Sequence, residues 1–183
     1  MDNNKIIFDE IVAEIKEEVI VTSNNLGWRF LVNSKNTIAK NNGIYLITLN
    51  PGGDEIIPEQ GQESCENGSA YLNEVWGNNE PGKNPLQIQI QLMFKKISEY
   101  LRKSDYISVL ENSVSGYFIP FRSPNIKTLK DKGRIIKFSE KIWKKILLHS
   151  THIKLIIVID NDALKSMLKI FSDNPFEVIS EEC

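Results

Sequence analysis

Apolar and polar residues follow two different periods along this chain. Near the N-terminus, apolar residues recur every four positions with acidic residues between them, which predicts an amphipathic helix over about residues 5–19. A second helix is predicted from Asn84 and Pro85 onward, because asparagine is a favourable N-cap and proline fits the first helical turn. The helical spacing predicts two further helices, over residues 135–146 and 161–171.

Short runs of β-branched and other apolar residues predict four strands. They cover residues 44–49, 113–119, 153–159 and 176–179. The third run is nearly all aliphatic, which is typical of a strand buried on both faces of a parallel sheet. Because strands and helices alternate, we expect an α/β fold: a three-layer sandwich whose central, mainly parallel four-stranded sheet is flanked by helices. The length fits a single domain over residues 1–183.

Loop-forming residues follow the first three predicted strands. Asn-Pro-Gly-Gly at residues 50–53 ends the first strand, since proline removes a backbone donor and glycine permits positive φ. Residues 120–124 follow the second strand, and residues 160–162 follow the third. In a parallel α/β sheet, ligands bind where the carboxyl ends of the strands meet their loops. We therefore expect these three loops to converge on one site.

Charge is distributed unevenly, although the net charge is only −2. Acidic residues dominate residues 2–80, and basic residues dominate residues 122–145. A local basic stretch on a nearly neutral protein fits a polyanion partner such as DNA, and it fits a solvated helix face equally well. The charge pattern leaves both interpretations open.

Few residues are suited to bind a metal or to form a disulfide. Cys65 and Cys183 are far apart, and the sequence adds only His149 and His152, so we expect no metal and no cofactor. No apolar run is long enough to cross a bilayer, and the N-terminus lacks a signal-peptide pattern. We therefore expect a cytoplasmic protein that does not enter a membrane, and we expect it to be a monomer.

The segment Leu-Asn-Pro-Gly at residues 49–52 resembles the first motif of one part of the uracil-DNA glycosylase superfamily. In its mismatch-type and single-strand-selective branches this motif is usually written G-[IM]-N-P-G. Residues 70–76 resemble the aromatic-bearing segment after that motif, and residues 113–124 resemble the middle strand and its loop. Residues 143–168 resemble the helix–strand–helix unit that precedes the last motif. The resemblance covers most of the chain from Gly27 onward.

This resemblance implies an enzyme that flips a nucleotide out of DNA and hydrolyses the bond between the base and the sugar C1′. Asn50 matches the motif asparagine, and its side-chain carbonyl would position the attacking water. Capping of a turn is the other interpretation of Asn50. Tyr71 is the first candidate for stacking on the flipped base, followed by Trp76 and Phe121. For these aromatic residues, a place in the core is the alternative.

The resemblance also implies contacts to the DNA backbone. Gly52 and Gly53 would let the nucleotide approach closely, and exposed amides there are suited to bind a phosphate. Arg122, Ser123 and Lys127 would contact phosphates from the loop after the second strand and from the residues that follow it. A surface ion pair is the other interpretation of Arg122.

Two features depart from the family pattern. Uracil-reading members have an asparagine at the end of the middle strand, where this chain has Tyr117 in the base-binding position. A tyrosine cannot offer uracil a paired donor and acceptor, so we expect a modified or damaged base as the substrate. The family's last motif contains a histidine followed by Pro-Ser, which this chain lacks. His149 and His152 precede the third strand and should lie at the opposite end of the sheet.

Three functions remain open on this basis. The first is a monofunctional DNA glycosylase that acts on double- or single-stranded DNA, in repair or in defence against base-modified viral DNA. The second is a catalytically inactive nucleic-acid-binding module with the same fold. The third is an unrelated α/β enzyme that acts on a nucleotide or another phosphate ester, although no P-loop, dinucleotide fingerprint or pair of catalytic carboxylates supports it.

Overall fold

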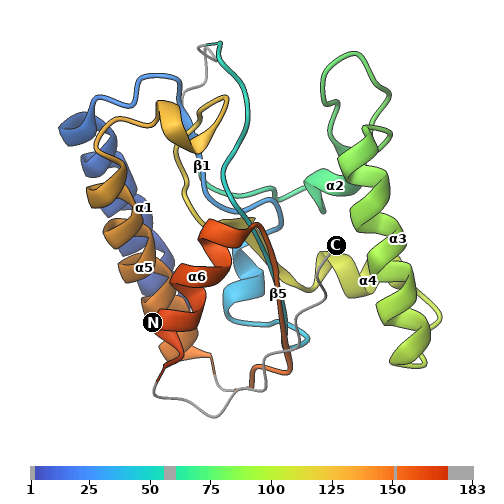
Figure 1. Ribbon diagram of the computed structural model, residues 1–183. Coiled ribbons are helices and arrows are strands. Elements are labelled where there is room, and N and C mark those ends of the chain that lie inside the picture. The colour runs from blue at the N-terminus through green and yellow to red at the C-terminus, as the bar shows by residue number, and fades with distance from the viewer. Residues whose placement is uncertain (1–2, 56–60, 151, 173–183) are drawn as a thin grey trace.

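The computed structural model describes residues 3–55, 61–150 and 152–172, and it shows a parallel sheet with helices on both faces (Figure 1). The strands are β1 (Trp28–Arg29), β2 (Ile44–Thr48), β3 (Gly61–Gln62), β4 (Val114–Tyr117) and β5 (Leu155–Ile159). The helices are α1 (Asn3–Thr22), η1 (Lys35–Ile38), α2 (Ala70–Asn73), α3 (Pro85–Tyr100), α4 (Tyr106–Glu111), η2 (Ile126–Thr128), α5 (Lys132–His149) and α6 (Asn161–Ile170), where η marks a short 3₁₀ helix.

The main sheet has three parallel strands in the order β4-β2-β5. This confirms the predicted α/β fold and three of its strands. A central sheet of four strands is not shown: the described residues form this sheet of three strands and a second parallel sheet of two, β1 and β3. The fourth predicted strand, residues 176–179, lies outside the described residues.

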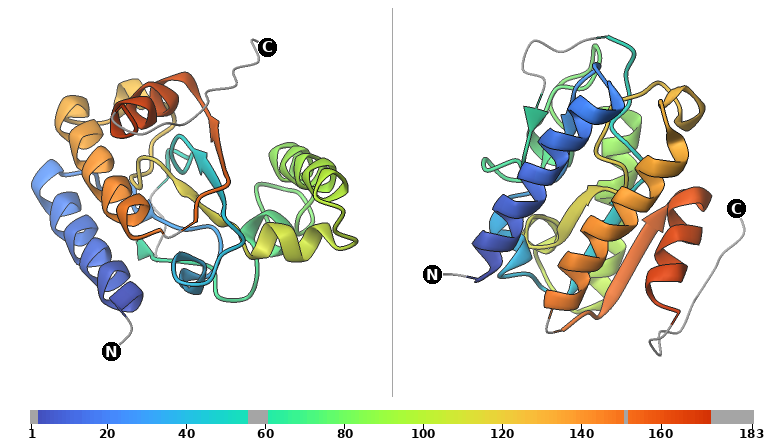
Figure 2. Two further views of the ribbon diagram at one scale, coloured as in Figure 1. Left: turned by 90° about the horizontal axis from the view of Figure 1, so that it is seen from below. Right: turned by 90° about the vertical axis from the view of Figure 1, so that its left-hand side faces the viewer.

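Strand β2 is buried along its whole length because helices cover both of its faces. Tyr45 and Ile47 pack into the core that α1, α5 and α6 share with the sheet. Ile44 and Leu46 point the other way, into the core built with α2, α3 and α4. The two groups of helices therefore lie on opposite sides of the sheet, as Figures 1 and 2 show. The alternation follows from the two-residue period of a strand.

The segment around β1 lies along the outer side of β4 and is joined to it by isolated bridges. It runs antiparallel to β4, with hydrogen bonds from the amide of Val32 to Ser115 O (2.9 Å) and from that of Tyr117 to Phe30 O (3.0 Å). The amide of Arg29 donates to Pro120 O (2.8 Å), just beyond the end of β4. This pairing places Arg29 at the carboxyl end of the sheet, where the site described below is formed.

The start of α3 agrees with its prediction from sequence. The Asn84 side chain accepts a hydrogen bond from the Leu86 amide (3.1 Å), and the Gln87 side chain accepts one from the Asn84 amide (3.0 Å). This reciprocal pair is a capping box, which satisfies amides that the first helical turn leaves without a partner.

Candidate functional site

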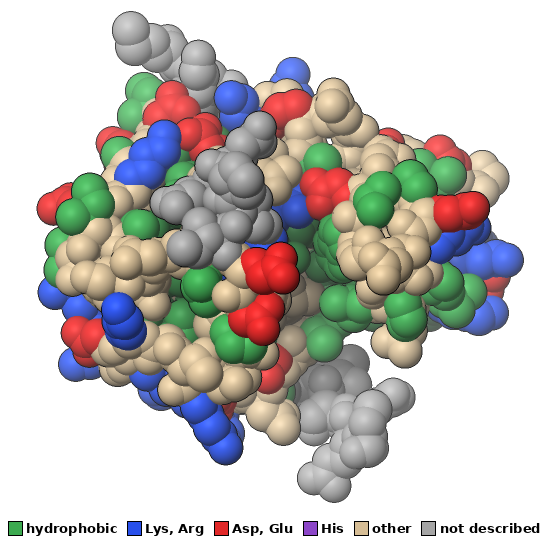
Figure 3. All heavy atoms as spheres, turned by 90° about the horizontal axis from the view of Figure 1, so that it is seen from above, with side chains coloured by type: hydrophobic (Ala, Val, Ile, Leu, Met, Phe, Trp, Pro, Cys, Tyr) green, Lys and Arg blue, Asp and Glu red, His purple; other side chains and the backbone are tan. Residues whose placement is uncertain are grey.

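The candidate site lies where the loops after β2 and β4 meet. The chain leaves β2 toward the helices α2, α3 and α4, whereas it leaves β4 toward α5 on the opposite face. Such a reversal between neighbouring parallel strands creates a crevice at their carboxyl ends, the usual ligand position in open α/β sheets. Figure 3 looks onto this end of the molecule and shows a hollow between the two groups of helices.

Asn50 joins the two loops through its side-chain amide. The Nδ2 group donates to Pro51 O (3.0 Å), Ser123 O (3.1 Å) and Ser123 Oγ (3.0 Å), and it approaches Phe121 O at 3.5 Å. Backbone carbonyls only accept hydrogen bonds, so they determine which end of the amide faces them. The carbonyl Oδ1 is then directed away, and no residue in the described ranges donates a hydrogen bond to it. This oxygen is available to a water molecule or ligand.

Further hydrogen bonds hold the two loops together. The Ser123 amide donates to Pro51 O (3.2 Å), and the Ile119 amide donates to Leu49 O (2.8 Å). The Arg122 Nη1 donates to Gly52 O (3.0 Å). The position of Asn50 is therefore set by both loops and does not depend on one turn alone.

The two glycines of the first loop have different constraints. Gly53 has a φ of 111°, and a Cβ atom there would lie 2.9 Å from the Arg122 Nη1. A Cβ atom on Gly52 would have no heavy atom within 4 Å. Gly53 is thus required by the backbone and by Arg122, whereas Gly52 faces open space from which a ligand can approach.

The predicted phosphate-binding side chains differ in their access to solvent. Lys127 is exposed on η2, in the same connection as the loop after β4. Arg122 is partly buried, and its guanidinium lies against the first loop. Ser123 is only 2% exposed, and its hydroxyl accepts the bond from Asn50. Ser123 is therefore placed to position Asn50. A residue that contacts a DNA phosphate would face solvent, and Ser123 does not.

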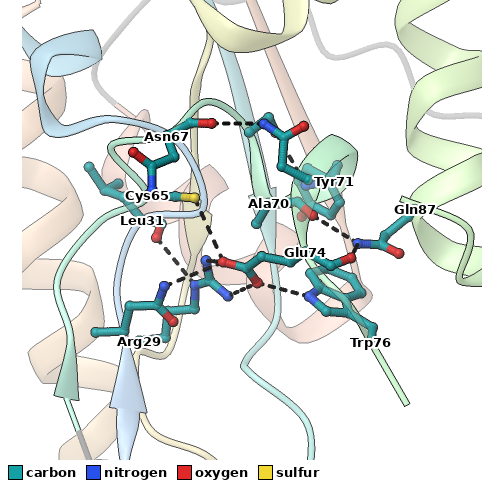
Figure 4. A network of polar contacts seen from close by, with 12 residues as sticks. Arg29, Leu31, Cys65, Asn67, Ala70, Tyr71, Glu74, Trp76 and Gln87 are labelled. Atoms are coloured by element: carbon teal, nitrogen blue, oxygen red, sulfur yellow. Dashed lines mark hydrogen bonds and ion pairs between the residues drawn. The ribbon is translucent and has the colours of Figure 1, made fainter. Parts of the chain in front are cut away.

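An ion pair between the buried Arg29 and the partly buried Glu74 lies beside this site (Figure 4). Arg29 Nη1 donates to Glu74 Oε2 (2.6 Å), and its Nη2 donates to Oε1 (2.5 Å), so the two planar groups pair side by side. Glu74 Oε2 also accepts from Trp76 Nε1 (3.0 Å). Burial by itself raises the pKa of the Glu74 carboxyl, but Arg29 outweighs burial and holds that pKa below its ordinary value.

Tyr117 lies within electrostatic reach of this pair. Burial raises the pKa of its phenol, while the nearby Arg29 favours the ionised form. Tyr117 is partly accessible and packs on the α2–α4 side of the sheet, opposite Thr48 in the strand register. It therefore belongs to the same side of the sheet as Arg29 and Glu74.

The other predicted aromatic residues do not all reach the hollow. Tyr71 is 1% exposed, and its ring meets that of Trp76 at a centroid distance of 5.5 Å. Trp76 keeps partial exposure. Phe121 is fully buried on the opposite face of the sheet, stacked on Phe138 at 5.9 Å. Trp76 and Tyr117 are therefore the accessible aromatic residues, with Tyr71 supporting Trp76 from the core.

Arg29 and Glu74 were not among the residues predicted from sequence. Their signal was weak: Arg29 interrupts the apolar run at residues 28–31, and Glu74 lies between two aromatic residues, Tyr71 and Trp76. A single charged residue among apolar residues predicts a buried ion pair only if the sequence also identifies the oppositely charged partner. The partner here is 45 residues away along the chain.

The basic stretch at residues 122–145 does not form one surface facing the hollow. Four of its side chains pair with acidic residues of α1 and α6: Lys132 with Asp162 (3.3 Å), Arg134 with Glu18 (2.5 Å), and Lys141 and Lys145 with Glu14 (2.9 and 2.5 Å). The helix-face interpretation therefore holds for these four residues. Arg122 and Lys127 precede α5 and lie in the connection after β4, so they remain the candidates for a basic role at the hollow.

The described part of the chain offers little support for a metal site or for a histidine at the candidate site. No group of three or more His, Cys, Asp or Glu residues there is arranged to hold a metal ion. His149 Nδ1 lies 2.8 Å from Lys145 O at the end of α5, and His152 precedes β5, so both lie at the amino end of the sheet. No helix within residues 3–172, gaps excepted, is long and apolar enough to cross a membrane.

Comparisons with known proteins identified no relative of this chain. No protein-family model matches the chain, and no curated protein or solved structure matches it either.

Proposed function

We propose that this protein is a monofunctional DNA glycosylase that hydrolyses the N-glycosidic bond of a flipped, modified or damaged base. The observation that carries the proposal is the orientation of Asn50. Its NH₂ group is bound by backbone carbonyls of both loops, which leaves its carbonyl oxygen available at the carboxyl end of the sheet. The resemblance of residues 49–52 to the glycosylase motif supports the same assignment.

In the proposed reaction, Asn50 orients the attacking water molecule. In base excision the bond between the base and C1′ breaks as water attacks C1′, with positive charge on the sugar. An amide oxygen is a weak base, but it accepts a hydrogen bond from water and holds it in line with C1′. Positioning of this kind removes an entropic part of the barrier without a proton transfer to the side chain.

Contacts to the base are proposed for two aromatic residues. Trp76 is accessible, and Glu74 fixes its indole through a hydrogen bond to Nε1 (3.0 Å). Tyr117 is at the end of β4, next to the Arg29–Glu74 pair. Since a phenol differs from an amide in its hydrogen bonding, Tyr117 supports a base other than canonical uracil.

Contacts to DNA phosphates are proposed for Lys127 and for the exposed backbone at Gly52 and Gly53. We further propose that the protein acts as a cytoplasmic monomer, in repair or in defence against base-modified viral DNA.

A panel of oligonucleotides tests the proposed function. Single- and double-stranded DNA carrying different modified bases would be incubated with the protein, and abasic sites would be detected by alkaline cleavage. We expect excision of at least one modified base and little excision of uracil. Tight DNA binding with no excision across a broad panel would instead support a non-catalytic nucleic-acid-binding module, which the tyrosine at position 117 also favours.

DNA affinity should fall as salt rises. If about three basic groups meet phosphates, the logarithm of the binding constant should fall against the logarithm of salt concentration with a slope of about −2 to −3. Lys127→Gln should reduce that slope by about 1, because Lys127 is exposed near the proposed site. Lys141→Gln is the matched control, since Lys141 pairs with Glu14 on α1 (2.9 Å). Equal slopes for the wild type and Lys127→Gln would contradict this assignment.

A further inference from the structure

Helix α5 lies between α1 and α6 in the helix layer on one side of the sheet, as Figure 2 shows. Its charged residues form two rows along the helix. The row toward α1 contains Arg134, Lys141 and Lys145, which pair with Glu18 and Glu14. Carboxylates of the fold therefore counter the positive charge on this side of α5.

The row toward α6 is different, because two of its lysines have no counter-charge. Lys137, Glu140, Lys144 and Leu148 follow one another at helical spacing and so share one face of α5. Lys137 and Lys144 are exposed, and neither forms an ion pair with a carboxylate of the described residues. Glu140 is paired with Lys169 of α6, at 3.6 Å. Lys169 also complements the dipole of α6, since it is in the last turn, whereas Lys137 and Lys144 are more than one turn from the end of α5.

These side chains line a groove between α5 and α6 with a volume of about 460 Å³. Five lysines line it, and Glu140 is the one acidic residue among the described residues that do so. Leu148, which is 69% exposed, and Ile170 add apolar surface at one end of the groove. The groove therefore combines unpaired cations with an apolar surface.

The groove lies away from the hollow that contains Asn50. Helix α5 ends before β5 begins, and α6 starts after β5 ends, so both helices run from the carboxyl end of the sheet to its amino end. Leu148 and Ile170 are in the last turns of these helices, at the amino end. A ligand in the groove would therefore leave the hollow free.

We propose that this groove binds the phosphodiester backbone of a single-stranded nucleic acid, with Lys137 and Lys144 contacting phosphates. Lysines that meet phosphates release the counterions of the strand, which favours binding. The two lysines are seven residues apart, a rise of about 10.5 Å along the helix, so they would reach different phosphates of an extended strand. Leu148 offers a surface to the apolar face of an unpaired base, which a duplex does not expose. This binding goes beyond the proposed function, because it requires no excision of a base.

The salt dependence of binding tests the two lysines. The affinity of the full chain for oligothymidylate, an unpaired strand, would be measured by fluorescence anisotropy over a range of salt concentrations. Each contact between a lysine and a phosphate of a single strand contributes about 0.7 to the slope of log affinity against log salt. We expect Lys137→Gln and Lys144→Gln each to reduce the slope by about 0.7, and the double variant to reduce it by about 1.4. A double variant with the wild-type slope would overturn the proposal.

Lys141→Gln is the matched control. It removes the same charge from the same helix, but Lys141 is paired with Glu14 at 2.9 Å. We expect it to retain the wild-type slope, and thermal unfolding would show that all variants are folded. If Lys141→Gln reduced the slope as much as Lys144→Gln does, the effect would come from net charge, and the groove would be refuted.

Competition experiments separate a nucleic acid from other anionic partners. Poly-glutamate and phosphatidylserine vesicles would be added to the complex with oligothymidylate, at equal concentrations of negative charge. We expect little displacement, because poly-glutamate has no base to pack on Leu148 and a flat membrane would contact the ridges of α5 and α6 instead of the groove between them. Displacement as strong as that by unlabelled oligothymidylate would show that the groove does not select nucleic acid.

NMR separates the groove from the proposed enzyme activity. Oligothymidylate should shift the amide signals of Lys144 and Lys169 in the wild type and leave them unchanged in the double variant. Single-turnover excision at saturating enzyme should be equal in both proteins, because the groove lies away from Asn50. Groove shifts in a protein that excises no base would refute the glycosylase function and support the groove. Shifts confined to Gly52 and Gly53 would refute the groove and leave the glycosylase function standing.

Discussion

Asn50→Ala should slow base excision by about two to three orders of magnitude, the scale of a lost positioning interaction. The side-chain carbonyl of Asn50 is held away from the carbonyl groups of Pro51 and Ser123, which bind its NH₂ group instead. Alanine removes that oxygen together with the bonds that orient it. Single-turnover rates on the best substrate, measured at saturating enzyme, would report the chemical step. DNA affinity should change little, because Asn50 is not expected to contact phosphates.

Two companion variants separate positioning from stability. Ser123→Ala removes one acceptor of the Asn50 amide, at 3.0 Å, but leaves the Asn50 carbonyl in place, so we expect a much smaller loss of rate. Asn50→Asp retains an oxygen that could orient water, yet it turns a carboxylate oxygen toward Pro51 O and Ser123 O. Acceptors facing acceptors repel each other, so we expect Asn50→Asp to be less stable than Asn50→Ala. Asn50→Ala that excises its best substrate at the wild-type rate would disprove the catalytic assignment.

Glu74→Gln should lower the free energy of unfolding by up to about 3 kcal/mol, because it removes one partner of an ion pair whose guanidinium is buried and whose carboxylate is partly buried. Arg29 is 5% exposed, and Glu74 is its ion-pair partner among the described residues. A neutral amide would leave the guanidinium buried without a counter-charge. Urea unfolding at neutral pH measures the effect. Glu99→Gln is the matched control, since Glu99 forms an exposed pair with Lys96 and should leave the free energy of unfolding nearly unchanged.

The pH dependence of stability gives this prediction a second readout. The pKa of Glu74 is lower in the folded protein than its ordinary value of 4.5. The unfolded chain therefore binds the proton more readily, so Glu74 stabilises the fold above pH of about 4.5 and loses this effect as pH falls through the folded pKa. Glu74→Gln should show a weaker loss of stability on acidification. The double variant Arg29→Met with Glu74→Gln should recover much of the stability. A Glu74→Gln protein as stable as the wild type would contradict the role of the pair.

The sequence by itself determined the elements whose signals are local. The strand predicted at residues 44–49 is β2, Ile44–Thr48, because a run of β-branched and aromatic residues ends at Asn-Pro-Gly-Gly. The helix expected from Asn84 is α3, since its cap and its apolar period lie within a few residues of each other. The same locality placed Asn50 and Arg122 at the ends of parallel strands, and so on one edge of the sheet.

Only the tertiary structure decided which side chains meet. Arg29 and Glu74 are brought together by the packing of segments far apart in sequence, and no local pattern encodes that contact. Aromatic residues have the same sequence pattern in a core and in a binding site, so the burial of Tyr71 and Phe121 could not be predicted. The charge pattern could not decide between a DNA-binding stretch and a helix face, because the acidic partners of Arg134 and Lys145 are on α1, more than a hundred residues earlier. The period of apolar residues shows which side of a segment is buried. Which side chain it contacts depends on how all the segments pack in three dimensions.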